Sequence, residues 1–115
     1  MIAVIFEAYP TEAGKAEYLA IAASLREYLK DQPGFISIER FQSLAQENKV
    51  LSLSFWEDEG AVDTWRNHVE HRIAQRKGWM GLFTKYRIRV ARVVRDYTES
   101  DRSGAPADSA GVTKD

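Results

Sequence analysis

Apolar and polar residues alternate along four stretches of the chain and recur at helical spacing along two others. The alternating stretches predict strands at residues 1–9, 35–43, 49–57 and 86–97. The helical stretches are residues 12–30 and 58–73. Thr11 is a suitable N-cap for the first helix, and Pro33-Gly34 ends the region that follows it. The resulting order, β-α-β-β-α-β, predicts an α+β protein with a ferredoxin-like antiparallel sheet.

Both faces of the predicted strands carry apolar residues. In the first strand Ile2, Val4 and Phe6 fall on one face, and Ala3 and Ile5 fall on the other. Two helices cover only one face of a four-stranded sheet, so the second face needs another cover. We therefore expect a homodimer in which the two sheets pack against each other.

The composition changes after Tyr97. Between residues 98 and 115 the only aliphatic residue larger than alanine is Val112, and the others are small, polar or charged. Such a segment buries too little apolar surface to offset its ordering entropy. The sequence therefore predicts one domain over residues 1–97 and a disordered tail over residues 98–115, the alternative being a tail that orders on a partner subunit.

Composition removes several classes of protein. The 115 residues are 44% hydrophobic, with 16 Lys and Arg against 17 Asp and Glu, which is typical of one globular domain with no default affinity for nucleic acid. There is no cysteine, which excludes disulfides, thiolate metal sites and a cysteine nucleophile. No apolar run approaches the roughly 20 residues of a membrane span, and the start lacks the basic region of a signal peptide. We expect a cytoplasmic protein.

The only two histidines, His68 and His71, lie three residues apart on the second predicted helix, so they occupy neighbouring turns of one face. One of them is a candidate proton acceptor or axial haem ligand, and the alternative is that both are polar residues at the helix rim. A metal site would need a third ligand such as Glu59 or Glu70, and without a motif such as H-E-x-x-H the evidence for zinc is weak.

Three aromatic residues are candidates for a substrate pocket. Trp65 lies on the apolar stripe of the second helix, where it packs in the core, walls a pocket, or does both. Phe83 and Tyr86 belong, with Trp79, to a segment that is broken by Gly78 and Gly81. That segment forms either a lid over the pocket or a loop anchored by these rings.

Charged and hydroxyl side chains in the strands supply the remaining candidates. Glu7 interrupts the first strand, so it either pairs with Arg40, Arg87 or Arg89 or acts as a general base of raised pKa. Arg87 and Arg89 either attract an anionic substrate or pair with acidic residues elsewhere. The hydroxyls of Ser37, Ser52 and Ser54 are expected to share a polar lining on the sheet, but no nucleophile elbow accompanies them.

Several of these residues together resemble the antibiotic biosynthesis monooxygenase family, a group of small dimeric α+β-barrel proteins. The resemblance covers residues 1–97 and is carried by Gly34-Phe35, Glu39, Phe55-Trp56-Glu57, Ala61, Trp65, His68, His71, Ala74-Gln75 and Gly78. It implies a dimeric α+β barrel. Some members resemble cofactor-free monooxygenases of quinol- or anthrone-like aromatics, others resemble haem-degrading monooxygenases, and some have no assigned chemistry.

We therefore predict an oxidoreductase that oxidises a small aromatic substrate with O₂ and needs no tightly bound cofactor. The predicted base is His68 or His71, with Glu7 as a third candidate. The predicted substrate contacts are Trp65, Phe83, Tyr86, Arg87 and Arg89. There is no phosphate loop or dinucleotide fingerprint to hold a flavin or nicotinamide. Two alternatives remain open: a haem-degrading enzyme, which the resemblance would equip with an asparagine near the position of Glu7, and a non-catalytic dimeric binding module.

Overall fold

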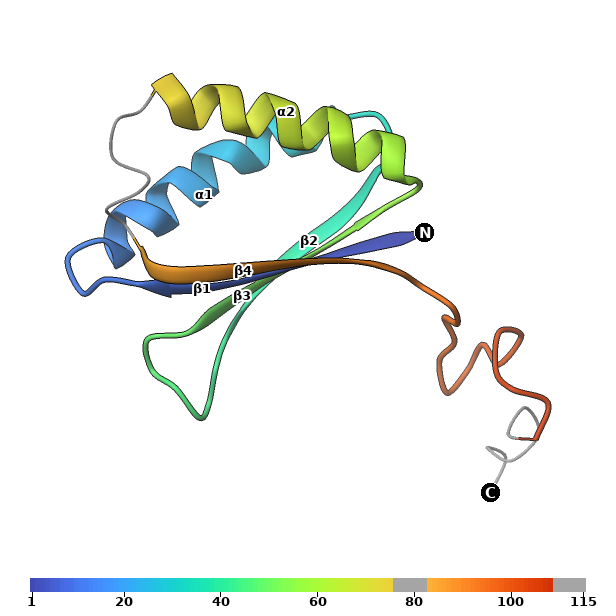
Figure 1. Cartoon of the computed structure of the whole chain (residues 1–115). Helices are drawn as coiled ribbons and strands as arrows, with labels where there is room; N and C mark the ends of the chain where they lie inside the picture. The colour runs from blue at the N-terminus through green and yellow to red at the C-terminus, as the bar shows by residue number, and fades with distance from the viewer. Residues whose placement is uncertain (76–82, 109–115) are drawn as a thin grey trace.

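The structure is a computed structural model that describes residues 1–75 and 83–108, with side chains up to residue 68 and again from residue 83. The elements are β1 (Ile2–Pro10), α1 (Lys15–Leu29), β2 (Phe35–Gln42), β3 (Val50–Trp56), α2 (Glu59–Gln75) and β4 (Phe83–Arg92) (Figure 1). This order confirms the predicted α+β class.

The four strands form one sheet in the order β2-β3-β1-β4, and neighbouring strands are antiparallel. Val4 of β1 lies opposite Ser54 of β3 on one side and Val90 of β4 on the other. Each helix connects two strands that are separated by a third strand, α1 passing from β1 to β2 and α2 from β3 to β4. This is the predicted ferredoxin-like topology.

Both helices lie on the same face of the sheet (Figure 1). Because side chains alternate along a strand, the even-numbered residues of β1 point toward the helices. Ile2 joins Leu29, Trp56 and Val62 in one buried cluster. A second cluster, at the other end of the sheet, consists of Ala8, Tyr18, Val50 and Phe83. The helix layer is thus fixed at its two ends, and among the described residues neither helix is long and apolar enough to cross a membrane.

The ends of two elements differ from the sequence prediction. The first helix begins at Lys15, because residues 11–14 form a separate turn in which the Gly14 amide donates to Thr11 Oγ1 over 2.8 Å. Gly14 directly precedes α1 and makes no side-chain cap, whereas Thr11 accepts the amides of Gly14 and Lys15 at the start of the turn. The last strand runs from Phe83 to Arg92, where we predicted residues 86–97. Among the described strands it pairs with β1 alone, and the ladder ends where Arg92 meets Ile2.

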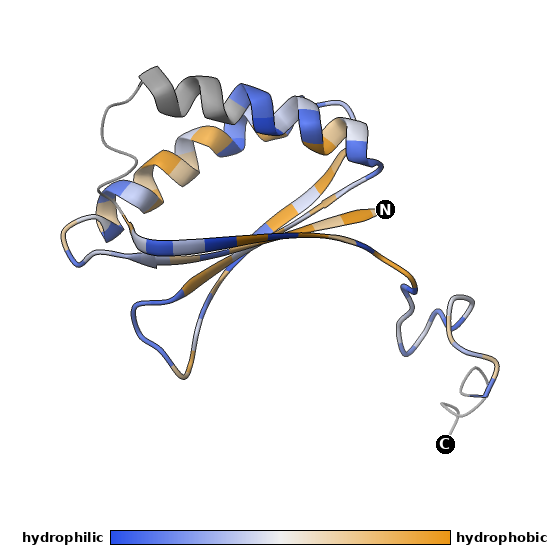
Figure 2. Ribbon diagram, in the orientation of Figure 1, coloured by the Kyte–Doolittle hydropathy of each residue, from blue (hydrophilic) through white to orange (hydrophobic). Residues whose placement is uncertain are grey.

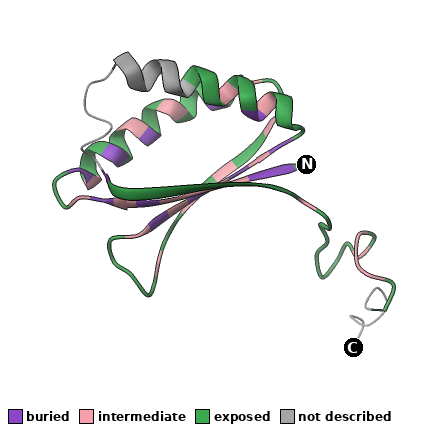
Figure 3. Ribbon diagram, viewed as in Figure 1, coloured by how far each residue is buried: buried purple, intermediate pink, exposed green. Residues whose placement is uncertain are grey.

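The opposite face of the sheet, which we call the open face, has no helix over it among the described elements. β3 turns Ser52 and Ser54 toward the helices, while Leu51, Leu53 and Phe55 lie half-buried on the open face. Apolar residues therefore occupy both faces, as the pattern predicted. Figure 2 shows hydrophobic residues along the strands of the sheet. β4 is exposed along almost its whole length (Figure 3). The homodimer stays a prediction.

Beyond β4 the described chain has neither helix nor strand as far as residue 108. It contains local turns. In one of them the Thr98 amide donates to the carbonyl oxygen of Asp101 over 2.8 Å, and the Asp101 amide donates to Thr98 Oγ1 over 2.8 Å. The domain boundary at residue 97 and the disorder of the tail stay predictions.

Candidate functional site

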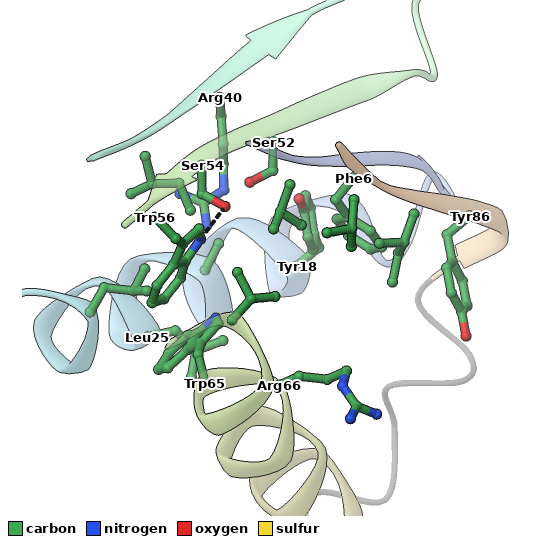
Figure 4. A pocket seen from close by; sticks show the side chains of 17 residues that line it. Phe6, Tyr18, Leu25, Arg40, Ser52, Ser54, Trp56, Trp65, Arg66 and Tyr86 are labelled. Carbon is green, nitrogen blue, oxygen red and sulfur yellow. Dashed lines mark hydrogen bonds between the residues drawn. The ribbon is translucent and has the colours of Figure 1, made fainter. Parts of the chain in front are cut away.

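A cavity of about 280 Å³ lies between the two helices and the sheet (Figure 4). Every described helix and strand contributes to its lining. The lining is mostly apolar, and its central members are Val4, Phe6, Tyr18, Leu25, Val62 and Trp65. A concave, largely apolar site with a few polar groups is the usual form of a small-molecule pocket.

Two tryptophans form one wall of the cavity. The rings of Trp56 and Trp65 stack with their centroids 6.1 Å apart, and Phe35 packs edge-on against Trp56. Trp56 is 1% exposed, and its indole N–H donates to Ser54 Oγ over 3.0 Å. Trp65 thus occupies the wall that the sequence proposed for it.

The polar groups of the cavity gather at β2 and β3. Arg40 lies opposite Ser52 in the register of the two strands. Ser54 lies two positions further along β3, on the same face as Ser52. Figure 4 shows the side chain of Arg40 extending toward Ser54 and Trp56. The Nε atom of Arg40 is buried and has no hydrogen-bond partner among the described residues. The third serine of the predicted lining, Ser37, lies opposite Phe55 and therefore faces the open side of the sheet.

The other end of the cavity opens along β4. Tyr86, Ile88 and Val90 line it and are 54%, 54% and 53% exposed. Phe83 does not line the cavity but is buried behind it, with its ring 5.1 Å from that of Tyr18 and 5.9 Å from that of Phe6. The predicted lid falls largely on residues 76–82, which include Trp79 and lie outside the described residues.

The histidines do not line the described cavity. His68 is exposed, and its ring lies between those of Trp65 and Tyr28, at 6.1 Å and 5.9 Å. His71 is part of α2, but its side chain lies outside the described residues, as does that of Glu70. Within residues 1–68 and 83–108 no group of three His, Cys, Asp or Glu side chains is arranged to hold a metal ion.

Glu7, Arg87 and Arg89 lie on the open face, with the sheet between them and the cavity. Glu7 accepts a hydrogen bond from Arg89 over 2.6 Å and pairs with Lys49 at 3.2 Å. The Lys49 and Arg89 cations hold the pKa of Glu7 below its ordinary value, and Glu7 in turn raises the pKa of Lys49. A base of raised pKa is therefore the wrong interpretation of Glu7, and its alternative, an ion pair with Arg89, is correct.

Arg40 lines the cavity, whereas the sequence suggests it only as a partner for Glu7. The two side chains lie on opposite faces of the sheet. A signal was available, because Arg40 is two residues from Ile38 and so shares its face in any regular strand. Arg66 of α2 also lines the cavity and was not singled out from the sequence.

A haem group does not fit the described lining. Haem iron in proteins is held by histidine, cysteine, methionine or tyrosine. The described lining contains no histidine, cysteine or methionine, and its tyrosines are Tyr18 and Tyr86. Tyr18 is 3% exposed within the aromatic packing, and Tyr86 stands at the open end.

A sequence model described as antibiotic biosynthesis monooxygenase matches residues 1–77. Over 93 residues the chain is 44% identical to a jasmonate monooxygenase from Pyricularia oryzae. The matched residues make up 81% of this chain and 43% of that protein. It is 32% identical to the protein YqjZ from Bacillus subtilis over 81% of this chain and 79% of the relative. The chain thus spans less than half of the fungal enzyme and most of the bacterial protein.

Two solved structures show the same fold at low sequence identity. A mutant of SnoaB, a cofactor-independent oxygenase from Streptomyces nogalater, is 16% identical with a TM-score of 0.66, covering 83% of this chain and 94% of that one. The haem-degrader MhuD from Mycobacterium tuberculosis, with two haems in its active site, is 16% identical with a TM-score of 0.67, covering 85% and 100%. The fold therefore occurs with and without a bound haem.

Proposed function

Since this chain belongs to the antibiotic biosynthesis monooxygenase family, we propose that it oxidises a small, largely apolar molecule with O₂ in the cavity beside Trp65, without a tightly bound cofactor. The observation that carries the proposal is the cavity itself, which is closed on one side by stacked tryptophans and is mostly apolar, with Arg40, Ser52 and Ser54 grouped on β2 and β3 and Arg66 on α2. The fungal relative named a monooxygenase supports an oxidoreductase, and SnoaB provides a precedent for this fold without a cofactor.

The proposed reaction balances without an external reductant. In an anthrone-like substrate, a carbon that bears two hydrogens loses a proton to the base and gives a stabilised carbanion or enolate. The anion passes one electron to O₂, the radical pair combines to a peroxide anion, and this anion takes the proton back to give a hydroperoxide. Loss of water then leaves a carbonyl group, so that R₂CH₂ and O₂ give R₂C=O and H₂O. A quinol reacts in the same way through its phenolate at a ring carbon that bears one hydrogen, and loss of water then gives a hydroxyquinone. The protein must exclude bulk water, hold the anion and accept the first proton.

We keep His68 as the proposed proton acceptor. The described lining contains neither an imidazole nor a carboxylate, and the exposed ring of His68 contacts the outer side of Trp65. A proton would therefore reach His68 by way of water at the rim. Aromatic walls favour a flat substrate, and quinol- or anthrone-like molecules are the class we propose to examine first.

The test is oxygen uptake by the full chain with a panel of quinols, anthrones and cyclic ketones. We expect one O₂ consumed per molecule oxidised, and His68→Ala should lower the rate by about 10²- to 10⁴-fold. Arg26→Gln, which removes an exposed cation from α1, is the matched control. No uptake with any compound that quenches tryptophan fluorescence, and so occupies the cavity, would overturn the proposal.

A homodimer is part of the same proposal. Leu53, Phe55 and Ile5 form a half-buried apolar strip on the open face, and nothing among the described residues covers it. A second copy that presents the same strip would bury both. The binding-module alternative expected a pocket filled by the protein's own side chains, whereas the described chain leaves a cavity of about 280 Å³.

A further inference from the structure

We propose that the ligand of this cavity is an organic carboxylate, held at its charged end by Arg40, Ser52 and Ser54, with its apolar body against Trp65. The inference rests on the proposed function in one respect, which is that it identifies this ligand as the substrate of the proposed reaction. Three features of the cavity point to such a ligand: a half-buried arginine whose buried Nε has no partner among the described residues, hydroxyls with protons to donate, and an apolar remainder.

Arg40 is a cation that lacks a partner. Its Nε atom is buried without a hydrogen bond, and among the described residues no carboxylate lies within ion-pair distance of it. The acidic residue of the same strand, Glu39, points to the other face because side chains alternate. Burying part of a guanidinium without compensation is costly, so an anion that enters the cavity would be stabilised there.

The two serines beside Arg40 are placed to donate as well. Ser54 Oγ already accepts the indole N–H of Trp56, so its own proton remains available to a ligand. Ser52 is 8% exposed, and its hydroxyl has no hydrogen bond among the described residues. Arginine has only donors. This end of the cavity therefore presents donors, and the planar guanidinium matches the two oxygens of a carboxylate.

The rest of the cavity determines the polarity and size of the part of the ligand beyond its carboxylate. Apart from Arg40, Arg66 and the two serines, the side chains that line it are apolar or aromatic. Arg66 stands on α2, away from the serines, with Asp63 at 3.8 Å (Figure 4). The polar end therefore accommodates one carboxylate, and the volume of about 280 Å³ fits a small ring or short chain attached to it.

The test compares phenylbutyrate with its neutral amide, using calorimetry and tryptophan fluorescence at neutral pH. We expect the wild-type chain to bind the acid about 10- to 100-fold more tightly than the amide, as for a hydrogen bond to a charged group. Arg40→Gln should abolish that preference, Arg40→Lys should keep part of it, and Arg26→Gln should leave it unchanged. If Arg40→Gln fails to fold by circular dichroism, Ser52→Ala serves instead and should reduce the preference.

The outcomes separate this inference from the proposed function. Equal affinity for acid and amide, a preference that survives Arg40→Gln in a folded protein, or no binding of phenylalkanoates of any chain length would each overturn the inference. Acid binding that depends on Arg40, without oxygen uptake on any substrate, would support the inference and remove the proposed function. Oxygen uptake on neutral substrates at a rate that Arg40→Gln does not change would support the proposed function and overturn the inference.

Discussion

Glu7 and Arg40 show how the face of the sheet decides what a charged residue does. Glu7 lies at an odd-numbered position of β1 and meets Arg89 and Lys49 on the open face. Arg40 lies on the helix side, where it lines the cavity together with Ser52, Ser54 and Trp56. A shift of one strand by a single position would place both side chains on the same face. The separation leaves one stable ion pair and one cation available to a ligand.

The ion pairs of Glu7 predict a dependence of stability on pH. Because the pKa of Glu7 is lowered from its ordinary 4.5 in the folded state, its contribution is present above that value and is lost as the pH falls through the lowered pKa. Thermal unfolding from about pH 7 to about pH 3 should show the melting temperature falling at the acid end. Glu7→Gln should lower the melting temperature at neutral pH and flatten this acid decline. Identical curves for Glu7→Gln and wild type would contradict the assignment, and Glu12→Gln is the control.

Two elements of secondary structure depend on single residues at their ends. α2 begins after Asp58, whose Oδ1 accepts the Ala61 amide over 2.8 Å. Before β2 the chain turns at Gly34, which has a φ of +80°. A Cβ at Gly34 would lie 2.6 Å from the Cβ of Ala61, so this turn packs directly on the first turn of α2. The end of one element thus fixes the start of another.

Removal of the helix cap should have a moderate effect. Asp58→Ala loses the hydrogen bond to the Ala61 amide and should lower the free energy of unfolding by about 1 kcal/mol. Asp58→Asn keeps an acceptor oxygen and should retain most of the stability. Urea denaturation measures both variants, and an unchanged midpoint for Asp58→Ala would show that the cap contributes nothing.

The glycine turn should be less tolerant. Gly34→Ala combines an unfavourable left-handed backbone with a close contact to Ala61, so we expect a loss of about 2 kcal/mol or more. Gly60→Ala, in the first turn of α2, is the matched control and should change stability by less than about 1 kcal/mol. Equal denaturation midpoints for the two variants would rule out a special role for Gly34.

The whole molecule is a two-layer structure with its cavity inside and an apolar sheet face outside. The cavity lies between helices and sheet, so the chain alone forms most of it. The open face lies on the other side of the same sheet, and a partner there would hold the strands that carry Arg40 and the serines from behind. Assembly would therefore affect the cavity through the sheet.

The dimer prediction is tested at the centre of the open face. Sedimentation velocity at micromolar concentration should show a dimer for the wild-type chain, as expected for an interface of more than ~1,000 Å². Leu53→Glu places a charge within that face and should shift the chain to monomer with its circular dichroism unchanged. Leu44→Glu, in the exposed β2–β3 loop, should remain dimeric. A monomeric wild type would remove the proposal.

The sequence by itself determined the order of elements, the topology of the sheet and the apolar character of both sheet faces. These follow from local periodicity, which a single chain displays without reference to its fold. The start of the first helix and the end of β4 were predicted wrongly, because a turn and a missing pairing partner set those boundaries. Trp65 could be assigned to a wall from its helical stripe alone.

Only the tertiary structure decided which face of the sheet the helices cover. The alternation in β3 separates Leu51 and Leu53 from Ser52 and Ser54, and on its own it favours leucines under the helices. The structure places the serines there instead, together with Arg40. A period of two assigns residues to two faces but does not say which face is inside, because that depends on helix crossovers and on what covers the other side.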